Sequence, residues 1–212
     1  MTVQEIYQSK WMTAEELSKT VESGWVLSVD PGASQPAEII KALCSRAAEG
    51  GLKNIKIHTM MDVYPFAFYM DNALDGRING LSWFSGAGAR KAVAGGYGDY
   101  IPNYYRDDPE LIRENYSFDA FCISVSPMDK HGYFSLATAC SYSEAMMEKA
   151  KRIFVEVNDQ QPRGVGNTQI HVSRVDAIVE SSYPLPVLPP VKLDETSIAI
   201  GSLIAEQIPD GA

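Results

Sequence analysis

An apolar run from Phe118 to Val125 constrains the fold of this chain more than any other segment. It has the length and composition of a buried strand. A polar loop follows it, with the sequence Ser124-Val-Ser-Pro-Met-Asp-Lys-His-Gly-Tyr-Phe-Ser135, and Pro127 and Gly132 mark its turns. Residues 124–135 are called the signature loop below. Because loops at strand ends carry the chemistry of α/β proteins, we expect this loop to face a functional site.

Strand and helix patterns alternate along the rest of the chain. Trp25–Val29 reads as a strand, Asp30-Pro-Gly-Ala-Ser-Gln-Pro36 as a turn, and Pro36 as the start of a helix that Gly50 ends, before a second strand at Asn54–Thr59. These segments form a βαβ unit. The same patterns predict strands at 78–84, 152–157 and 175–179, and helices at 13–24, 66–74, 85–93, 108–114, 142–151 and 194–205. We therefore predict an α/β fold with a mostly parallel open sheet and helices on both faces.

The composition argues against several classes of function. The formal net charge of −9 disfavours a nucleic-acid surface, which needs clustered Lys and Arg. The three cysteines, Cys44, Cys122 and Cys140, show no C-x-x-C spacing and stand in apolar surroundings, so we expect buried, reduced thiols and a cytoplasmic protein. The chain shows neither an apolar run of membrane-spanning length nor a signal-peptide pattern, and we expect no membrane association.

Common cofactor and metal motifs are also missing from the sequence. Gly86-Ala-Gly88 continues to Lys91 where a dinucleotide-binding loop would have its third glycine, and there is no P-loop. His58, His131 and His171 are too far apart to suggest a zinc site, so we predict no metal. A G-x-S-x-G turn for a nucleophilic serine is absent as well.

The polar residues of the signature loop each allow two interpretations. Ser126, beside Pro127, favours a hydrogen bond within its own turn over a nucleophilic role. His131 could serve as an acid or base, or could hold the turn through a hydrogen bond. Asp129 is either a solvated charge or a residue that orients a neighbouring group.

Charged residues outside the signature loop are weaker candidates. Arg163 lies on the glycine-containing loop 161–166, where its planar guanidinium could bind a carboxylate or phosphate with two hydrogen bonds or could lie in solvent. Glu156 and Glu180 stand at or near strand ends, where an attacking carboxylate could lie, but nothing around either indicates an activated nucleophile.

Four stretches together resemble the N-terminal half of the acetyl-CoA hydrolase/transferase family, notably the 4-hydroxybutyrate and butyryl-CoA:acetate CoA-transferases. They are the Asp30–Pro36 turn, the signature loop, Asn158–Gly166 and Ile170-His-Val-Ser-Arg-Val-Asp-Ala-Ile-Val-Glu180, and the likeness covers nearly the whole chain. The resemblance implies two similar α/β halves with the active site between them. It also implies a ping-pong transfer, in which a glutamate carboxylate attacks an acyl-CoA thioester and becomes a glutamyl-CoA thioester.

The end of the chain resembles the start of the family's second half. The residues Ile208-Pro-Asp-Gly-Ala212 would there lead to a Gly-Ile-Gly-x-Ile-Pro loop for CoA and then to the nucleophilic glutamate, and this sequence contains neither. We therefore expect residues 1–190 to form the N-terminal α/β domain and residues 191–212 to form a connector and helix that lead to an absent C-terminal half. No catalytic residue is assigned, and the chain alone is expected to be inactive.

The resemblance implies a set of substrate-binding residues. Gly32 and Ser34 would offer backbone amides at a helix N-terminus, and Arg163 would hold an anionic group. The pocket for the acyl group or carboxylate would be shaped by four residues of the signature loop, Ser126, Met128, Asp129 and His131.

Partners and alternatives follow from the same resemblance. The substrates would be an acyl-CoA and a short-chain carboxylate, with CoA as substrate and no permanently bound cofactor. The C-terminal half of the same enzyme would be the protein partner, in a homodimer. Two other functions remain open: an acyl-CoA hydrolase, in which water replaces the acceptor acid, and a non-catalytic subunit or binding module of the same fold.

Overall fold

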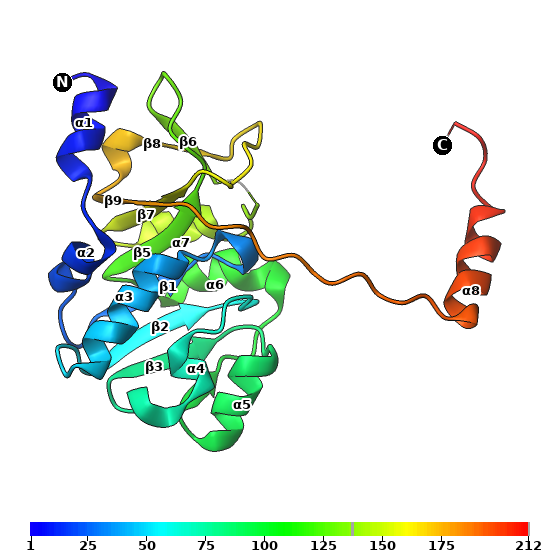
Figure 1. Ribbon diagram of the computed structural model, residues 1–212, viewed down its shortest axis with the longest axis horizontal. Helices are drawn as coiled ribbons and strands as arrows, with labels where there is room; N and C mark the ends of the chain where they lie inside the picture. Colours follow the sequence, from blue (N-terminus) through cyan, green and yellow to red (C-terminus); the bar gives the residue numbers. More distant parts are fainter. Residues whose placement is uncertain (137, 212) are drawn as a thin grey trace.

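Seven parallel strands form the central sheet of the protein, in the order β4-β3-β2-β1-β5-β7-β9 (Figure 1). The computed structural model describes residues 1–136 and 138–211. Ala137, in the predicted domain 1–190, and Ala212, in the predicted connector and helix 191–212, lie outside the described residues. The strands are β1 Val26–Val29, β2 Ile55–Thr59, β3 Ile78–Ser82, β4 Gly98–Tyr100, β5 Ala120–Val125, β7 Ile153–Asn158 and β9 Ala177–Ser181.

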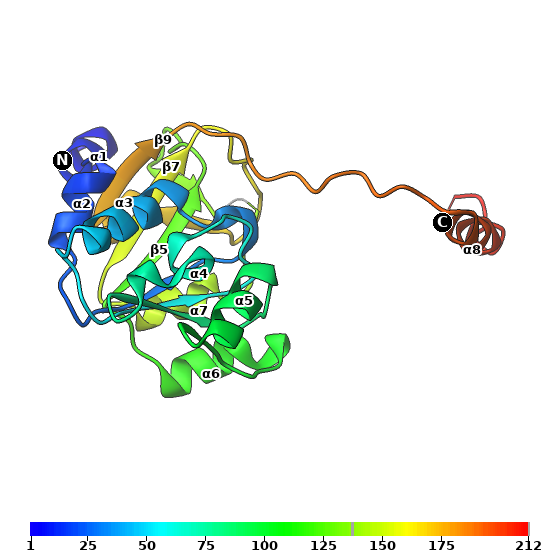
Figure 2. The ribbon, with the colours of Figure 1, turned by 60° about the horizontal axis from the view of Figure 1, so that its bottom comes forward.

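Helices cover both faces of the sheet (Figures 1 and 2). One hydrophobic cluster joins one face to α2, α3, α4 and α5, and a second joins the other face to α1, α6 and α7. Both the fold class and the helices on both faces, predicted from the sequence, are confirmed. The helices are α1 Val3–Lys10, α2 Ala14–Thr20, α3 Ala37–Ala48, α4 Ala67–Met70, α5 Ala87–Gly95, α6 Asp108–Asn115, α7 Ser143–Lys149 and α8 Glu195–Ala205, with short 3-10 turns at Gly32–Ser34, Asn72–Leu74, Tyr105–Asp107 and Val172–Arg174.

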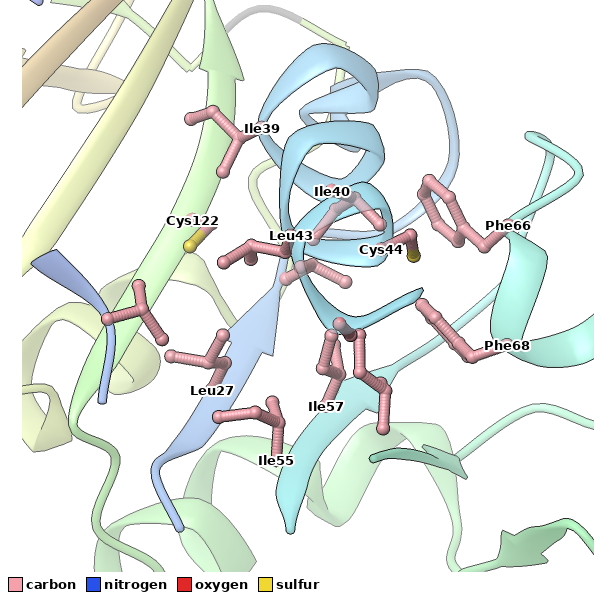
Figure 3. Close-up of a cluster of buried hydrophobic side chains, with 14 of the residues drawn as sticks. Leu27, Ile39, Ile40, Leu43, Cys44, Ile55, Ile57, Phe66, Phe68 and Cys122 are labelled. Carbon is pink, nitrogen blue, oxygen red and sulfur yellow. The ribbon is translucent and has the colours of Figure 1, made fainter. Parts of the chain in front are cut away.

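Alternation along the strands explains why an unbroken apolar run can form a central strand. In β5, Cys122 belongs to the cluster under α3, whereas Phe121 and Ile123 belong to the cluster under α6 and α7. Since both faces are covered, every residue of β5 is buried. Figure 3 shows the first of these clusters, in which Ile39 and Leu43 of α3 lie over the strands near Cys122. Each such side chain contributes roughly 1.5–3 kcal/mol through burial.

Four short elements were not predicted. α1 begins at a capping box formed by Thr2 and Glu5, and it is anchored by Lys10, whose Nζ donates to the carbonyl of Val172 at 2.9 Å. Two three-residue strands, β6 (Tyr133–Ser135) and β8 (Gln169–His171), form a separate antiparallel pair, and β4 is equally short. Strands of this length leave no periodic pattern in the sequence, because they depend on their partners for definition.

The last predicted helix is present as α8, and a segment without regular structure, residues 182–194, precedes it. The chain leaves β9, runs extended through its proline-rich segment, and forms α8, which stands clear of the rest of the molecule (Figures 1 and 2). Asp194 caps α8 by accepting the amide of Ser197 at 2.7 Å. Ile198, Leu203 and Ile204 are each more than half exposed on it. A helix with apolar side chains on several faces is normally buried in its complete protein.

The cysteines follow the prediction in two of three cases. All three thiols are free, Cys44 and Cys122 are buried, and burial raises their pKa values to about 11 and about 12. The expectation of burial is wrong for Cys140, which is exposed because it lies in the irregular segment between β6 and α7 and outside the sheet sandwich. Among the described residues, none of the helices combines the length and apolar composition needed to cross a membrane.

Candidate functional site

The two loops selected from the sequence meet at one point of the sheet. The Asp30–Pro36 turn follows β1, the signature loop follows β5, and these two strands pair with Val29 opposite Cys122. Strand β1 is also where the order of the sheet reverses, with β2 on one side and β5 on the other. In open α/β sheets the crevice at the carboxyl ends of such strands is the usual place for a ligand. The two loops therefore lie where the topology predicts a ligand site.

Asp129 organises the signature loop. Its Oδ1 accepts the backbone amides of His131 at 2.8 Å and Tyr133 at 2.9 Å. The backbone hydrogen bond from Tyr133 and then that from His131 lower the pKa of this carboxyl, and the charge of Arg163 lowers it further. Asp129 is therefore an ionised residue that orients its neighbours, the second of the two roles considered for it.

Arg163 holds the signature loop through four hydrogen bonds. Its guanidinium donates to Asp129 Oδ2 at 2.8 Å, to the carbonyls of Pro127 and Tyr133 at 3.1 Å each, and to Ser126 Oγ at 3.4 Å. The anion that Arg163 holds in this structure is thus the carboxylate of Asp129. A role for Arg163 toward a substrate anion stays a prediction, and it would require exchange of this partner.

Ser126 hydrogen-bonds within its own turn, as the sequence favoured. Its Oγ donates to the carbonyl of Pro127 at 3.1 Å and accepts the amide of Ser135 at 3.0 Å, and the side chain is buried. His131 is exposed at the tip of the loop. Met128 is half-buried and lines a hollow of about 400 Å³ together with Tyr7 and Glu180. Within the loop, His131 and Met128 are the candidates that a ligand can reach directly.

The turn after β1 uses its polar groups internally. Gly32–Ser34 forms a 3-10 turn, in which the amide of Ser34 donates to the carbonyl of Pro31 at 3.3 Å. Ser34 is buried, and its Oγ shares a hydrogen bond of 2.9 Å with Thr138. The long helix α3 starts later, at Ala37. The amide expected from Ser34 is therefore already engaged in this structure, and binding of a ligand by Gly32 or Ser34 stays a prediction.

The N-terminus of α3 is filled by a carboxylate of the chain itself. Glu156 on β7 accepts the amide of Ile39 at 2.9 Å, the hydroxyl of Tyr183 at 2.5 Å and the hydroxyl of Ser181 at 3.2 Å. The Tyr183 oxygen in turn accepts the amide of Ala37 at 3.3 Å. Burial raises the pKa of Glu156, although these hydrogen bonds oppose the shift. A helix N-terminus attracts anions, and here Glu156 takes that position.

Gln161 joins three segments of the site and was missed by the sequence reasoning. Its Nε2 donates to the carbonyl of Ala33 at 2.7 Å and to Ser124 Oγ at 3.1 Å, and its Oε1 accepts from Thr138 at 3.4 Å. It thereby links the loop after β7 to the turn after β1 and to the end of β5. Only its presence in the Asn158–Gly166 stretch pointed to it, because these contacts are distant in sequence.

A second linking pair lies on the β2 side of the site. Gln35 donates through Nε2 to Asp62 Oδ1 at 2.6 Å and accepts the amide of Val63 at 3.1 Å. Asp62 Oδ2 accepts the hydroxyl of Thr59 at 2.9 Å, and burial raises the pKa of Asp62 to about 6. The pair ties the loop after β2 to the turn after β1.

Asp30 carries a buried carboxyl directly after β1. Its Oδ1 accepts the hydroxyl of Ser143 at 2.6 Å, and Oδ2 has no hydrogen-bond partner among residues 1–136 and 138–211. The side chain is inaccessible to solvent, and burial raises its pKa well above the ordinary value. A neutral acid is the form that such surroundings favour. Among the described residues, acidic, histidine and cysteine side chains do not cluster as metal ligands would.

The chain matches the N-terminal domain model of one protein family and several characterised relatives. The model is the acetyl-CoA hydrolase/transferase N-terminal domain, and it matches residues 1–189. The succinyl-CoA:cyclohexane-1-carboxylate CoA transferase of Geobacter metallireducens is 34% identical over 97% of this chain and 46% of its own length. The butyryl-CoA:acetate CoA-transferase of Anaerostipes caccae is 35% identical over 100% of this chain and 48% of its own length.

Solved structures agree with these relatives. The crystal structure of RipA from Yersinia pestis superposes with a TM-score of 0.90 at 34% identity, covering 100% of this chain and 51% of that one. A 4-hydroxybutyrate CoA-transferase from Porphyromonas gingivalis has the same fold, with a TM-score of 0.71 at 24% identity. The chain spans about half the length of the curated relatives that it matches. It belongs to the acetyl-CoA hydrolase/transferase family, as the N-terminal domain of that family.

Proposed function

We propose that this chain is the N-terminal half of a CoA-transferase that moves CoA between an acyl-CoA and a short-chain carboxylate such as acetate, butyrate or 4-hydroxybutyrate. The observation that carries the proposal is the match over the full chain to the butyryl-CoA:acetate CoA-transferase of Anaerostipes caccae, at 35% identity. The two loops that lie together at the carboxyl ends of β1 and β5 support it, because they would face a second half placed against that edge. We place the enzyme in the cytoplasm, and the homodimer expected above is likewise part of the proposal.

The proposed chemistry proceeds through a glutamate of the second half. Its carboxylate attacks the thioester carbonyl of the acyl-CoA, the C–S bond breaks, and CoA leaves as a thiolate. The thiolate then attacks the glutamyl carbonyl, which releases the donor acid as a carboxylate and leaves a glutamyl-CoA thioester. The acceptor carboxylate repeats the two exchanges in reverse. Each step replaces one acyl–oxygen or acyl–sulfur bond by another, and CoA is a substrate throughout.

The residues of this chain would shape the pocket in which these exchanges occur. Asp129, Ser126 and Arg163 hold the signature loop in one conformation through the hydrogen bonds described above. Met128 and His131 would then contact the acyl group or carboxylate. Because Glu156 and Tyr183 occupy the first amides of α3, we expect the phosphates of CoA to bind on the second half.

The test compares the 212-residue chain with the full-length protein, that is, the chain continued by its second half. Each is incubated with acetyl-CoA and butyrate, and the acyl-CoA products are separated by chromatography and identified by mass spectrometry. We expect the full-length protein to form butyryl-CoA and the isolated chain to form none. Turnover by the isolated chain would contradict the placement of the nucleophile. Release of free CoA without butyryl-CoA would indicate a hydrolase, and no reaction at all would favour a binding module.

Variants of the full-length protein test the pocket. Met128→Ala and His131→Ala should change the preference between acetate, butyrate and 4-hydroxybutyrate, measured as the ratio of kcat/KM values. Lys130→Ala is the control, because Lys130 is an exposed neighbour on the same turn. If the two pocket variants kept the preference of the control, the signature loop would not contact the substrate.

A further inference from the structure

Four aromatic side chains are exposed at or just after the carboxyl ends of β3 and β4. Phe84 is 54% exposed, Tyr100 45%, Tyr104 74% and Tyr105 56%. Taking about 200 Å² for each side chain, they expose on the order of 400 Å². The largest apolar patch on a monomeric protein is of about this size and is often functional. We call these four residues the aromatic patch.

Hydrogen bonds hold the segments of the aromatic patch side by side. Tyr100 pairs with Ser82 in the sheet, and the amide of Ile101 donates to the carbonyl of Ser82 at 2.9 Å. Asn103 Nδ2 bridges the two segments, donating to the carbonyls of Trp83 at 3.3 Å and Ile101 at 3.1 Å. The four residues therefore stand on two neighbouring segments whose backbone is fixed to the same end of the sheet.

The connector, here the extended segment from Tyr183 to Asp194, also starts at the carboxyl ends of the strands. It follows β9, which is the edge strand opposite β4. β9 and β4 are the two outermost strands, so their carboxyl ends lie about 29 Å apart at a strand spacing of about 4.8 Å. Two hydrogen bonds fix Tyr183, just after β9. Its hydroxyl donates to Glu156 at 2.5 Å, and its carbonyl accepts from Asn158 Nδ2 at 3.0 Å. The extended chain from there to Asp194 reaches up to about 40 Å. A body joined through α8 can thus extend along the whole edge to the aromatic patch.

We propose that the aromatic patch is the docking surface for the second half of the full-length protein, with α8 as the first buried helix of that half. The proposal rests on the two-half organisation in the proposed function. Its occupant follows from the relatives, which are about twice the length of this chain, and from the apolar surface of α8, which the body of this chain leaves uncovered. A second half tethered by the connector is present at millimolar effective concentration, which favours it over a second copy. Docked there, it would cover the loops that follow β1 and β5.

Hydroxyl-radical footprinting followed by mass spectrometry tests the proposal on the full-length protein and on the 212-residue chain. Oxidation of Phe84 and Tyr104 should be about fivefold slower or more in the full-length protein, as expected when a ring that is 74% exposed becomes buried. Trp11, 44% exposed beside β9, is the internal control and should oxidise equally in both proteins.

A double variant, Phe84→Ser with Tyr104→Ser, tests the same surface without relying on those two rings. In the full-length protein it should restore the oxidation of Tyr100 and Tyr105 to the rate seen in the 212-residue chain. The urea midpoint of the 212-residue chain should stay unchanged, which shows that the variant still folds. Val93→Ser near the C-terminus of α5, which leads into the amino end of β4, is the matched control and should leave the protection intact.

The outcomes separate this proposal from the proposed function. Full-length protein that exchanges CoA while Phe84 and Tyr104 oxidise as fast as in the isolated chain would overturn the docking surface alone. Protection without CoA exchange would support the docking surface and overturn the proposed function. Protection already present in the 212-residue chain, lost on dilution and accompanied by a dimer in sedimentation, would identify a second copy as the occupant and overturn the proposal.

Discussion

Replacing Tyr183 by Phe tests how the N-terminus of α3 is stabilised. The change keeps the ring, which packs edge-on against Tyr64 with centroids 6.0 Å apart, and removes only the hydroxyl. That hydroxyl donates to Glu156 at 2.5 Å and accepts the amide of Ala37 at 3.3 Å. The residue before the helix, Pro36, makes no capping hydrogen bond from its side chain, so α3 has no local substitute.

The expected loss of stability follows from these two hydrogen bonds. A hydrogen bond to a charged group contributes about 1.5–3 kcal/mol, and Glu156 is inaccessible to water that could replace the donor. Loss of a helix cap costs about 1 kcal/mol, but the second hydrogen bond is long and α3 keeps the carboxylate of Glu156. We therefore expect Tyr183→Phe to lower the free energy of unfolding by about 2–3 kcal/mol.

Urea unfolding of the 212-residue chain, followed by far-ultraviolet circular dichroism, measures the effect. The midpoint should fall while the slope with urea stays the same, since the surface exposed on unfolding is unchanged. Tyr104→Phe is the matched control, because Tyr104 is exposed, and it should change stability by less than about 0.5 kcal/mol. The reasoning is refuted if the two variants unfold at the same urea concentration.

Two further predictions concern Asp62 and Gly132. The folded pKa of Asp62, about 6, lies above its unfolded value of about 3.9, so the native state binds the proton more tightly and loses stability as pH rises between these values. Measured against Asp62→Asn, the wild-type chain should therefore lose about 2–3 kcal/mol in urea unfolding between pH 4 and pH 7, and a difference that did not vary with pH would contradict this. Gly132 has φ +90°, and an added Cβ would lie 2.7 Å from both His171 Nε2 and Val3 Cγ1, whereas Gly166 has φ +96° and open space around it. Gly132→Ala should lower the thermal unfolding temperature well below that of the control Gly166→Ala. The free energy of unfolding should fall by more than about 2 kcal/mol for Gly132→Ala and by about 1 kcal/mol, from backbone strain alone, for Gly166→Ala. Equal losses in the two variants would show that the loop moves aside to accommodate the new Cβ.

Local patterns were enough to predict most elements of the fold. The run ending at Val125, the Asp30–Pro36 turn and the apolar face of α3 all carry their signal within a few residues, because strand and helix periodicity is a short-range property. The short elements were not predicted, because they are too short to show a periodic pattern. α1 has a capping box, but its packing depends on Lys10 and the carbonyl of Val172, which are 162 positions apart.

The candidate site was predicted as a location more than as a set of contacts. The signature loop and the Asp30–Pro36 turn do lie together, and the turn role of Ser126 is confirmed. The partners of Arg163 and the linking role of Gln161 were not visible, since the sequence does not state which distant group will fill a hydrogen bond. Binding of substrate by any of these residues stays a prediction.

By itself, the sequence determined the class of fold, the position of the signature loop, and the family to which the chain belongs. These depend on local periodicity and on runs of consecutive residues. Only the tertiary structure decided that Glu156 fills the N-terminus of α3, 117 positions away from its partner Ile39. It also showed which aromatic side chains are exposed at the carboxyl ends of β3 and β4. Burial and long-range hydrogen bonding belong to the packed chain as a whole, and for that reason no local pattern contains them.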